Sequence, residues 1–253
     1  MLRRRRTIVF FILFLVVAVV CGVSLQKHLH HPDALWRIVN EQCVPHQRNN
    51  QNPEPCAKVD LPSGFVLLKD INGPLQYLLL PTDKMNGMES PELLQAKTAN
   101  FLWLAWQQRN VMSVRRSAHV PEDVVSLTIN SATGRSQNQL HIHISCLRAD
   151  VRDQLNQYAN TVSTDWQTFP VSLAGNQYIA RKVTAAEFSQ RSPFIMLATQ
   201  VPQAREHMGR YSLAMAQLAD GEWIALATER NLLRLNLASA EQLQDHDCGL
   251  LKK

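Results

Sequence analysis

The sequence is short of the residues that keep a chain unfolded. It has only nine glycines and twelve prolines among 253 residues, whereas 45% of its residues are hydrophobic. A disordered chain shows the opposite balance, with few apolar residues and many breakers. The composition therefore predicts an ordinary packed core. The length exceeds the usual size of one domain, but by too little to demand two independent ones.

The chain also has almost no net charge outside its first residues. Its formal charge of +5 comes from 26 basic and 21 acidic residues, and the run 3–6 (RRRR) supplies four of the basic ones. The rest of the chain therefore carries 22 basic against 21 acidic residues. A nearly neutral body lacks the basic face that binds a nucleic acid, so no nucleic-acid partner is expected.

No two cysteines are separated by two residues, and this absence removes the commonest sign of a structural zinc site. Apart from Cys21, the cysteines are Cys43, Cys56, Cys146 and Cys248, an even number that suits disulfides in an oxidising compartment. Cys43 and Cys56 bracket a short polar loop and form the preferred pair, which leaves Cys146 for Cys248. The sequence alone permits three pairings.

A long apolar run is present only near the N-terminus. Residues 7–25 are uncharged, and at about 1.5 Å per residue they approach the ~30 Å thickness of bilayer hydrocarbon. The arginines before the run place the N-terminus in the cytoplasm. A cleaved signal peptide is the alternative, but the run is longer than a usual signal core and no small-x-small site closes it. We expect a basic flank (1–6), one transmembrane anchor (7–25), a linker (26–34) and an extracytoplasmic domain (35–253).

Short apolar and β-branched runs separated by turn residues predict antiparallel strands. Two hairpins are expected, one over 65–80 around an Asn-Gly-Pro turn and one over 211–227 around Asp-Gly. Helical spacing appears over 101–112 and 148–160. We therefore predict an α+β fold, with antiparallel sheets and helices packed on one side. The second hairpin loosely resembles the first, so an internal duplication is an option.

The most informative segment is 139–144 (QLHIHI), which alternates polar and apolar residues. In a strand, Gln139, His141 and His143 then share one face, while the aliphatic residues between them point into a core. Three polar side chains on a well-formed strand are costly unless that face opens to a site or a ligand. The segment therefore predicts a functional site.

Three interpretations of this face compete. It could be a solvent-exposed strand that is rich in histidine. It could hold a metal, with a third ligand from His207 or Asp70. It could carry phosphoryl or nucleotidyl transfer, because an imidazole that titrates near neutrality can attack phosphorus and divide one difficult displacement into two easier ones.

The third interpretation is supported by a resemblance. The run from Gly134 through Ser136 to the alternating histidines resembles the signature of the histidine-triad (HIT-like) superfamily, and the first hairpin, from Asp70 to Pro81, resembles its strand–Asp–hairpin–Pro element. More narrowly, nearly the whole chain resembles the bacterial CDP-diacylglycerol pyrophosphatase family. The stretches that carry this likeness are NGPLQYLLLPT, NFLWLAWQ, QNQLHIHISC, REHMGRY and RNLLRLN.

The resemblance implies a HIT-like sheet and a set of roles. His141 corresponds to the nucleophile and His143 to a phosphate-contacting position, while Asp70, Asn130 and Ser136 correspond to substrate-binding positions. Gln139 stands where the superfamily has its first histidine, and we expect it to bind substrate through its amide. A second register, with His143 central, stays open, although the spacing of Gly134 and Ser136 favours His141.

The implied reaction is hydrolysis of CDP-diacylglycerol to CMP and phosphatidate, by a catalytic domain held at the bacterial inner membrane. The expected partners are this substrate and the lipid bilayer, with no metal and no cofactor, and the superfamily resemblance adds a homodimer as an option. Two alternatives remain. One is a hydrolase of soluble nucleotides, and the other is a non-catalytic envelope protein that binds nucleotides or lipid headgroups.

Overall fold

The computed structural model describes residues 31–252. The predicted flank 1–6, the anchor 7–25 and most of the linker 26–34 lie outside the described residues. No helix within 31–252 combines the length and the apolar character needed to cross a bilayer.

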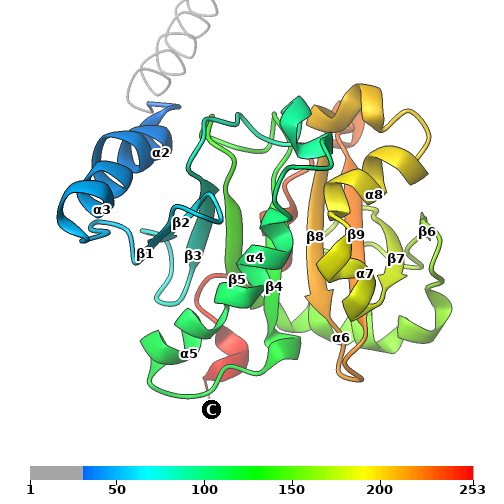
Figure 1. Cartoon of the computed structure of the whole chain (residues 1–253). Helices are drawn as coiled ribbons and strands as arrows, with labels where there is room; N and C mark the ends of the chain where they lie inside the picture. Colours follow the sequence, from blue (N-terminus) through cyan, green and yellow to red (C-terminus); the bar gives the residue numbers. More distant parts are fainter. Residues whose placement is uncertain (1–30, 253) are drawn as a thin grey trace, which may run out of the picture.

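The described chain forms one large antiparallel sheet with helices on both faces (Figure 1). The strands are β1 (Lys58–Asp60), β2 (Phe65–Lys69), β3 (Tyr77–Pro81), β4 (Val125–Ile129), β5 (Ile142–Leu147), β6 (Gln167–Thr168), β7 (Ile179–Val183), β8 (Tyr211–Gln217), β9 (Trp223–Glu229) and β10 (Gln244–Asp245). The α-helices are α2 (Ala34–Arg37), α3 (Val44–Asn50), α4 (Phe101–Gln108), α5 (Asn110–Arg116), α6 (Ala149–Gln157), α7 (Ala185–Gln190) and α8 (Pro193–Gln200), and a π-helical turn, Ile38–Cys43, joins α2 to α3. The predicted α+β class and antiparallel sheet are confirmed.

The strand order is β1-β2-β3-β5-β4-β8-β9-β7-β6, with β10 paired to the end of β5. This order repeats one arrangement twice about the central β4–β8 pair. In each half an outer hairpin (β2–β3 or β6–β7) is followed by helices and then by an inner hairpin (β4–β5 or β8–β9). A duplicated unit would produce this order, and common ancestry of the two halves stays a prediction.

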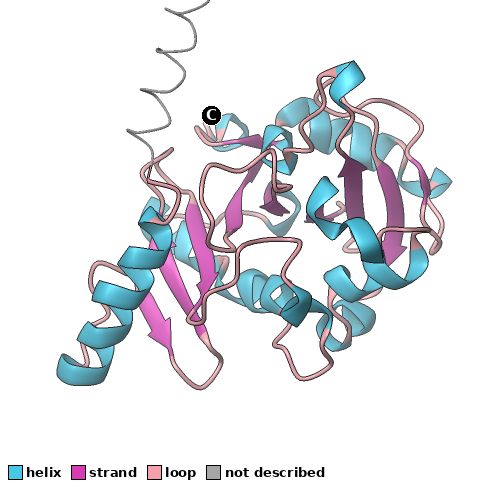
Figure 2. Ribbon diagram, turned by 90° about the horizontal axis from the view of Figure 1, so that it is seen from above, coloured by secondary structure: helices cyan, strands magenta, loops and turns pink. Residues whose placement is uncertain are grey.

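The two faces of the sheet are covered differently. On one face, α4, α7 and α8 pack over a continuous apolar core that includes Leu127, Ile142 and Ile144. On the other face, α6 covers the β8–β9 half, whereas the helical segment α2–α3 covers β2 and β3. Figure 2, seen from above, shows helices on both sides of the sheet. The expectation that helices pack on one side was wrong, because α2–α3 and α6 each bury an apolar stripe against the second face.

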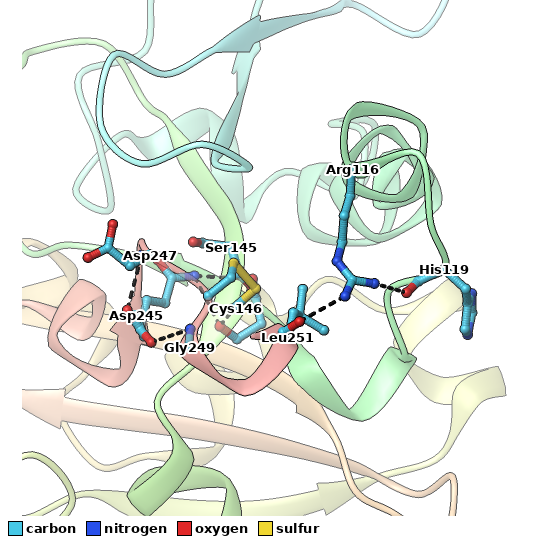
Figure 3. Close-up of a disulfide and its surroundings, with 11 residues drawn as sticks. Arg116, His119, Ser145, Cys146, Asp245, Asp247, Gly249 and Leu251 are labelled. Carbon is cyan, nitrogen blue, oxygen red and sulfur yellow. Dashed lines mark hydrogen bonds between the residues drawn. A yellow bond between two sulfur atoms is a disulfide. The ribbon is translucent and has the colours of Figure 1, made fainter. Parts of the chain in front are cut away.

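Both predicted disulfides are confirmed. Cys43 bonds Cys56 and ties the π-helical turn to the loop before β1. Cys146, on β5, bonds Cys248 in the C-terminal tail (Figure 3). The second bond closes a sequence separation of 102 residues and fixes the tail beside the histidine-bearing strand.

The predicted hairpins are present as β2–β3 and β8–β9. The predicted helix over 101–112 is instead two helices, α4 and α5, divided at Arg109. The histidine strand begins at Ile142, later than expected, so Gln139 and His141 precede the regular strand. His143 lies within the strand, opposite Leu78 of β3 and Thr128 of β4.

Candidate active site

The site lies where a polar strip interrupts the second face of the sheet. Two apolar clusters cover this face, one under α2–α3 and the other under α6. Between them lie polar side chains that are almost fully buried: Gln76, Ser126, Thr128, His143 and Gln244. Burying such groups is costly unless they are hydrogen-bonded, so this strip is the part of the sheet where function is most expected.

Gln139 is fully buried, and backbone groups use its side-chain amide. Its Nε2 donates to the carbonyl oxygens of Pro81 (3.0 Å) and Asp83 (2.9 Å), while the backbone N–H of Met85 donates to its Oε1 at 3.3 Å. These bonds satisfy both amide hydrogens and one acceptor site. Gln139 therefore clamps the loop after β3 to the segment that leads into β5, which differs from the substrate-binding role expected of it.

His141 is held by a short backbone contact. Its Nδ1 lies 2.6 Å from the carbonyl oxygen of Gln139. A carbonyl only accepts, so Nδ1 carries the proton and donates, and in the neutral ring Nε2 keeps its lone pair. Residues 31–252 offer this Nε2 no hydrogen-bond partner. Burial lowers the pKa of His141, so the neutral form with a free Nε2 predominates at neutral pH.

His143 is positioned by two neighbours in series. Gln76 Nε2 donates to Asp70 Oδ2 at 2.6 Å and lies 3.2 Å from His143 Nδ1. Because the Asp70 carboxylate only accepts, it fixes the Gln76 NH₂ group toward both partners, and His143 Nδ1 must then be an acceptor. The His143 proton is therefore on Nε2, which is buried and has no partner among the described residues. Burial and the neighbouring His141 lower the pKa of His143 to about 4.

The two histidine rings lie edge to face, with centroids 4.9 Å apart. Only 7% of His141 and 5% of His143 is exposed, so the interpretation as a solvent-exposed histidine-rich face was wrong. One ring presents an unprotonated nitrogen, and its neighbour presents an unpaired N–H. An unprotonated ring nitrogen beside a hydrogen-bond donor is an arrangement suited to attack on a phosphate.

The C-terminal segment brings two further titratable groups to the site. Glu241, in the 3-10 turn η7 (Ala240–Leu243), has Oε1 3.5 Å from His143 Nδ1 and 3.0 Å from His246 Nε2. Burial opposes ionisation of Glu241, but the hydrogen bond from His246 and the neighbouring donors outweigh it and lower its pKa to about 2. The same hydrogen bond raises the pKa of His246. Each member of the pair therefore favours the charged form of the other.

The sequence did not identify Glu241 or His246 as site residues. One signal could have found them, because the expected Cys146–Cys248 bond already places the residues before Cys248 beside the histidine strand. The backbone of His246 also packs closely on Gly73 in the β2–β3 turn, where a Cβ atom would come within 2.3 Å of the His246 carbonyl oxygen. The tail, the first hairpin and β5 thus meet at one point.

Asn130 is brought to the site and holds Glu241. Its Nδ2 donates to Glu241 Oε2 at 3.0 Å, and its Oδ1 accepts from the backbone N–H of Glu241 and the hydroxyl of Ser239, both at 3.1 Å.

Ser136 is exposed, and the described residues give its side chain no hydrogen bond. Four substrate-binding residues were expected from the sequence. Asp70 bonds Gln76, Asn130 bonds Glu241, and Gln139 bonds the backbone of the loop after β3. Ser136 lies exposed on the loop between β4 and β5.

Arg135 is a further cation near the site, and the sequence pattern did not indicate it. Its guanidinium is bidentate to Glu89, with NH1–Oε2 at 2.8 Å and NH2–Oε1 at 2.5 Å. The buried Nε has no partner among residues 31–252. The charge of Arg135 is close enough to contribute to the lowered pKa of His141, after burial as the main cause. An arginine whose charge acts on His141 suits an anionic phosphate bound near this ring.

An open cleft of about 630 Å³ adjoins the cluster on this face, and Ser239, Glu241, Gln244 and His246 are among its lining residues. The metal interpretation gains no support from the geometry. His207 is exposed, Asp70 is bonded to Gln76, and no group of three or more His, Cys, Asp or Glu side chains is placed to hold a metal ion within residues 31–252.

A comparison with models of protein families identifies the family of the chain. The family model described as CDP-diacylglycerol pyrophosphatase matches residues 30–252, which is nearly the whole chain and includes every residue of the site. The chain belongs to the CDP-diacylglycerol pyrophosphatase family. It is therefore a phosphoanhydride hydrolase of phospholipid metabolism, with CDP-diacylglycerol as its substrate. This assignment excludes the non-catalytic alternative and favours the lipid substrate over a soluble nucleotide.

Proposed function

We propose that the chain hydrolyses CDP-diacylglycerol to CMP and phosphatidate through a covalent nucleotidyl-histidine intermediate on His141. The observation that carries this mechanism is the free Nε2 lone pair of His141, which follows from the bond between Nδ1 and the Gln139 carbonyl oxygen. Nε2 attacks the phosphorus attached to cytidine, and the bond from that phosphorus to the bridging oxygen breaks. Phosphatidate then leaves. Water attacks the same phosphorus in the second step, the P–N bond breaks, and CMP is released.

The Gln139 carbonyl oxygen can stabilise the positive charge that develops on the His141 ring. When Nε2 bonds to phosphorus, the ring becomes positive and its Nδ1–H donates more strongly to the Gln139 carbonyl oxygen 2.6 Å away. His143 cannot attack as readily, because Gln76 occupies its Nδ1 and its Nε2 carries the proton. This contrast supports the register in which His141, and not His143, is the nucleophile.

The phosphate oxygens need donors as charge redistributes. The unpaired Nε2–H of His143 is one, and the unpaired Nε–H of Arg135 is another. His246, whose protonated form is favoured by Glu241, supplies the proton for the departing phosphatidate oxygen and takes one back from the attacking water. All atoms and protons then balance over the two steps.

We further propose a cellular location for the protein. Residues 7–25 anchor it in the bacterial inner membrane, with the N-terminus cytoplasmic and the HIT-like catalytic domain in the periplasm. The two disulfides support an oxidising compartment. An anchor suits this substrate, because both acyl chains can remain in the bilayer while the headgroup enters the site, and co-localisation raises the effective concentration. A homodimer stays a prediction.

The covalent intermediate can be trapped. CDP-diacylglycerol labelled in the cytidine-side phosphate is mixed with the full-length protein, quenched in denaturant at alkaline pH and mapped by peptide mass spectrometry. We expect the label on His141, loss of turnover in His141→Ala, and ordinary turnover in His119→Ala, whose side chain is 71% exposed and remote from the cluster. A label on His143 would refute the assignment, and faster turnover of a water-soluble dinucleotide than of the lipid would refute the substrate.

A further inference from the structure

The loop after β9 exposes apolar side chains where most surfaces are polar. Leu232, Leu233, Leu235 and Leu237 are 60%, 99%, 88% and 45% exposed. They account for four of the seven exposed large apolar side chains within residues 31–252. Scattered exposed leucines are ordinary, but four within six positions form a patch that calls for a partner. We call residues 231–237 the leucine loop.

The leucine loop is built to hold these side chains outward. The backbones of Asn231 and Asn236 form a pair of hydrogen bonds (2.8 and 2.9 Å) that closes the loop, and Asn231 Oδ1 accepts from the backbone N–H of Arg234. Asn236 is buried, and its amide bonds Thr228 Oγ1, the Glu229 carbonyl oxygen and the Ala238 N–H. The polar side chain is thus inside and the leucines are outside, which inverts the usual pattern of a soluble loop.

Basic residues flank the leucines. Arg234 lies within the loop and is exposed, and no acidic side chain among the described residues pairs with it. Arg230 precedes the loop, and exposed Arg210 lies beside Glu229 at the end of the adjoining strand. Leucines that are bordered by arginines complement a surface that is apolar inside and anionic at its boundary, as an anionic phospholipid bilayer is.

The leucine loop is continuous with the active site. The Leu237 carbonyl oxygen accepts from Ser131 Oγ (2.6 Å) and Thr133 Oγ1 (3.1 Å), at the start of the segment 130–141 that carries Arg135 and ends at His141. On the other side of the loop, Ser239 bonds Asn130. A few residues therefore separate the exposed leucines from the groups that would handle the phosphates.

The same segment also meets the N-terminal end of the described chain. The backbone N–H of Asn138 donates to the Pro32 carbonyl oxygen at 2.6 Å, and Gln137 Nε2 donates to the His31 carbonyl oxygen at 3.2 Å. Figure 1 shows the beginning of α2, the start of β5 and the end of β9 at one end of the sheet. The expected anchor ends at residue 25, and the six residues up to His31 span at most about 20 Å.

We propose that the leucine loop is a second membrane contact, which inserts its leucines into the leaflet that holds the substrate and sets the active-site end of the sheet against an anionic phospholipid surface. This inference rests on the proposed lipid-hydrolase function, and it adds the surface by which the domain receives its substrate. The anchor tethers the domain, whereas the loop orients it, so the cytidine diphosphate headgroup has only a short path to His141.

Insertion can be measured without relying on activity. Full-length Leu233→Trp and Val114→Trp variants are placed in nanodiscs of phosphatidylethanolamine and phosphatidylglycerol, with and without brominated acyl chains, and the fluorescence of the parent protein is subtracted. Val114 is 71% exposed on α5, far along the chain from the leucine loop, and serves as the matched control. Insertion to a depth of about 5–10 Å predicts quenching at position 233 that exceeds quenching at 114 more than about twofold. Equal quenching overturns the inference, whether the loop then faces water or a second copy of the chain.

A kinetic test separates this inference from the proposed function. In Leu232→Gln/Leu233→Gln, we expect KM for CDP-diacylglycerol in bilayers to rise about tenfold with kcat unchanged, because the change removes positioning and leaves the chemical groups intact. Val114→Gln should leave both constants unchanged. Unchanged KM in the loop variant overturns the inference. If the parent instead fails to hydrolyse the lipid while position 233 is still quenched, the proposed function fails and the membrane contact stands.

Discussion

The ion pair between Glu241 and His246 predicts an unusual pH dependence of stability. The perturbation is Glu241→Gln, which keeps the shape of the side chain and removes its charge. In the parent protein, the carboxylate accepts from His246 Nε2 and Asn130 Nδ2, both at 3.0 Å. An amide cannot accept at both positions, because one of its atoms is now a donor that faces the Asn130 donor.

The magnitude follows from the lowered pKa of Glu241. A fall from its ordinary value of 4.5 to about 2 corresponds to about 3 kcal/mol of stabilisation, in line with one or two hydrogen bonds to charged groups. This stabilisation is present above pH 4.5 and is lost as the pH falls through about 2. The pKa of His246 is raised above its ordinary value of 6.5. The stabilisation from protonated His246 is therefore fully present below pH 6.5, and it is lost as the pH rises through the pKa of His246 in the folded protein.

The difference in unfolding free energy between parent and Glu241→Gln should therefore be largest between pH 4.5 and 6.5, at about 3 kcal/mol, and should shrink on both sides. Urea unfolding of the full-length protein in detergent, followed by near-ultraviolet circular dichroism, measures it. Glu122→Gln is the control, because Glu122 pairs with Arg109 but is 43% exposed, and such pairs contribute less than about 1 kcal/mol. A difference for Glu241→Gln that is independent of pH, or no larger than that of Glu122→Gln, would refute the reasoning.

Two further predictions concern the scaffold of the site. Gln139→His should lower both Tm and turnover, although it restores a histidine to the triad pattern. A neutral imidazole can replace at most two of the three hydrogen bonds made by Gln139, and each buried group left without a hydrogen bond costs about 1–3 kcal/mol. Thermal scans and initial rates test this, and a more active variant would contradict it. Replacing Cys146 and Cys248 by serine should lower the free energy of unfolding by about 4–5 kcal/mol and abolish most turnover, because this disulfide holds the segment that carries Glu241. Replacing Cys43 and Cys56 by serine should lower the free energy of unfolding by about 3 kcal/mol and leave kcat unchanged. Equal losses of kcat in the two double variants would count against the tail's role.

The sequence predicted the parts of the site that depend on local geometry. Alternation along 139–144 placed His141 and His143 on one face, and the rings do lie side by side. Periodicity and turn residues likewise located both hairpins. These features depend on neighbours within a few residues, which is the range over which strand alternation and turn chemistry act.

The parts it could not predict depend on distant segments. The role of Gln139 follows from the path of the loop from Pro81 to Met85, which nothing in the local pattern specifies. Glu241 lies in a 3-10 turn, and His246 lies in the turn that follows the two-residue strand β10, and these elements are too short to carry a periodic signal. The second helical layer was missed for a similar reason, because the apolar residues of α2–α3 and α6 pack against strands that are distant in the sequence.

The position of Glu241 and His246 far downstream of β5 has a consequence for the order in which the site is assembled. Both residues follow the histidine strand by about a hundred positions, as Cys248 follows Cys146 by 102, so a nascent polypeptide has this strand before it has the partners of the strand. Glu241 and His246 reach β5 only after they have been synthesised, and the Cys146–Cys248 bond, which is stable under oxidising conditions, then holds their segment beside that strand.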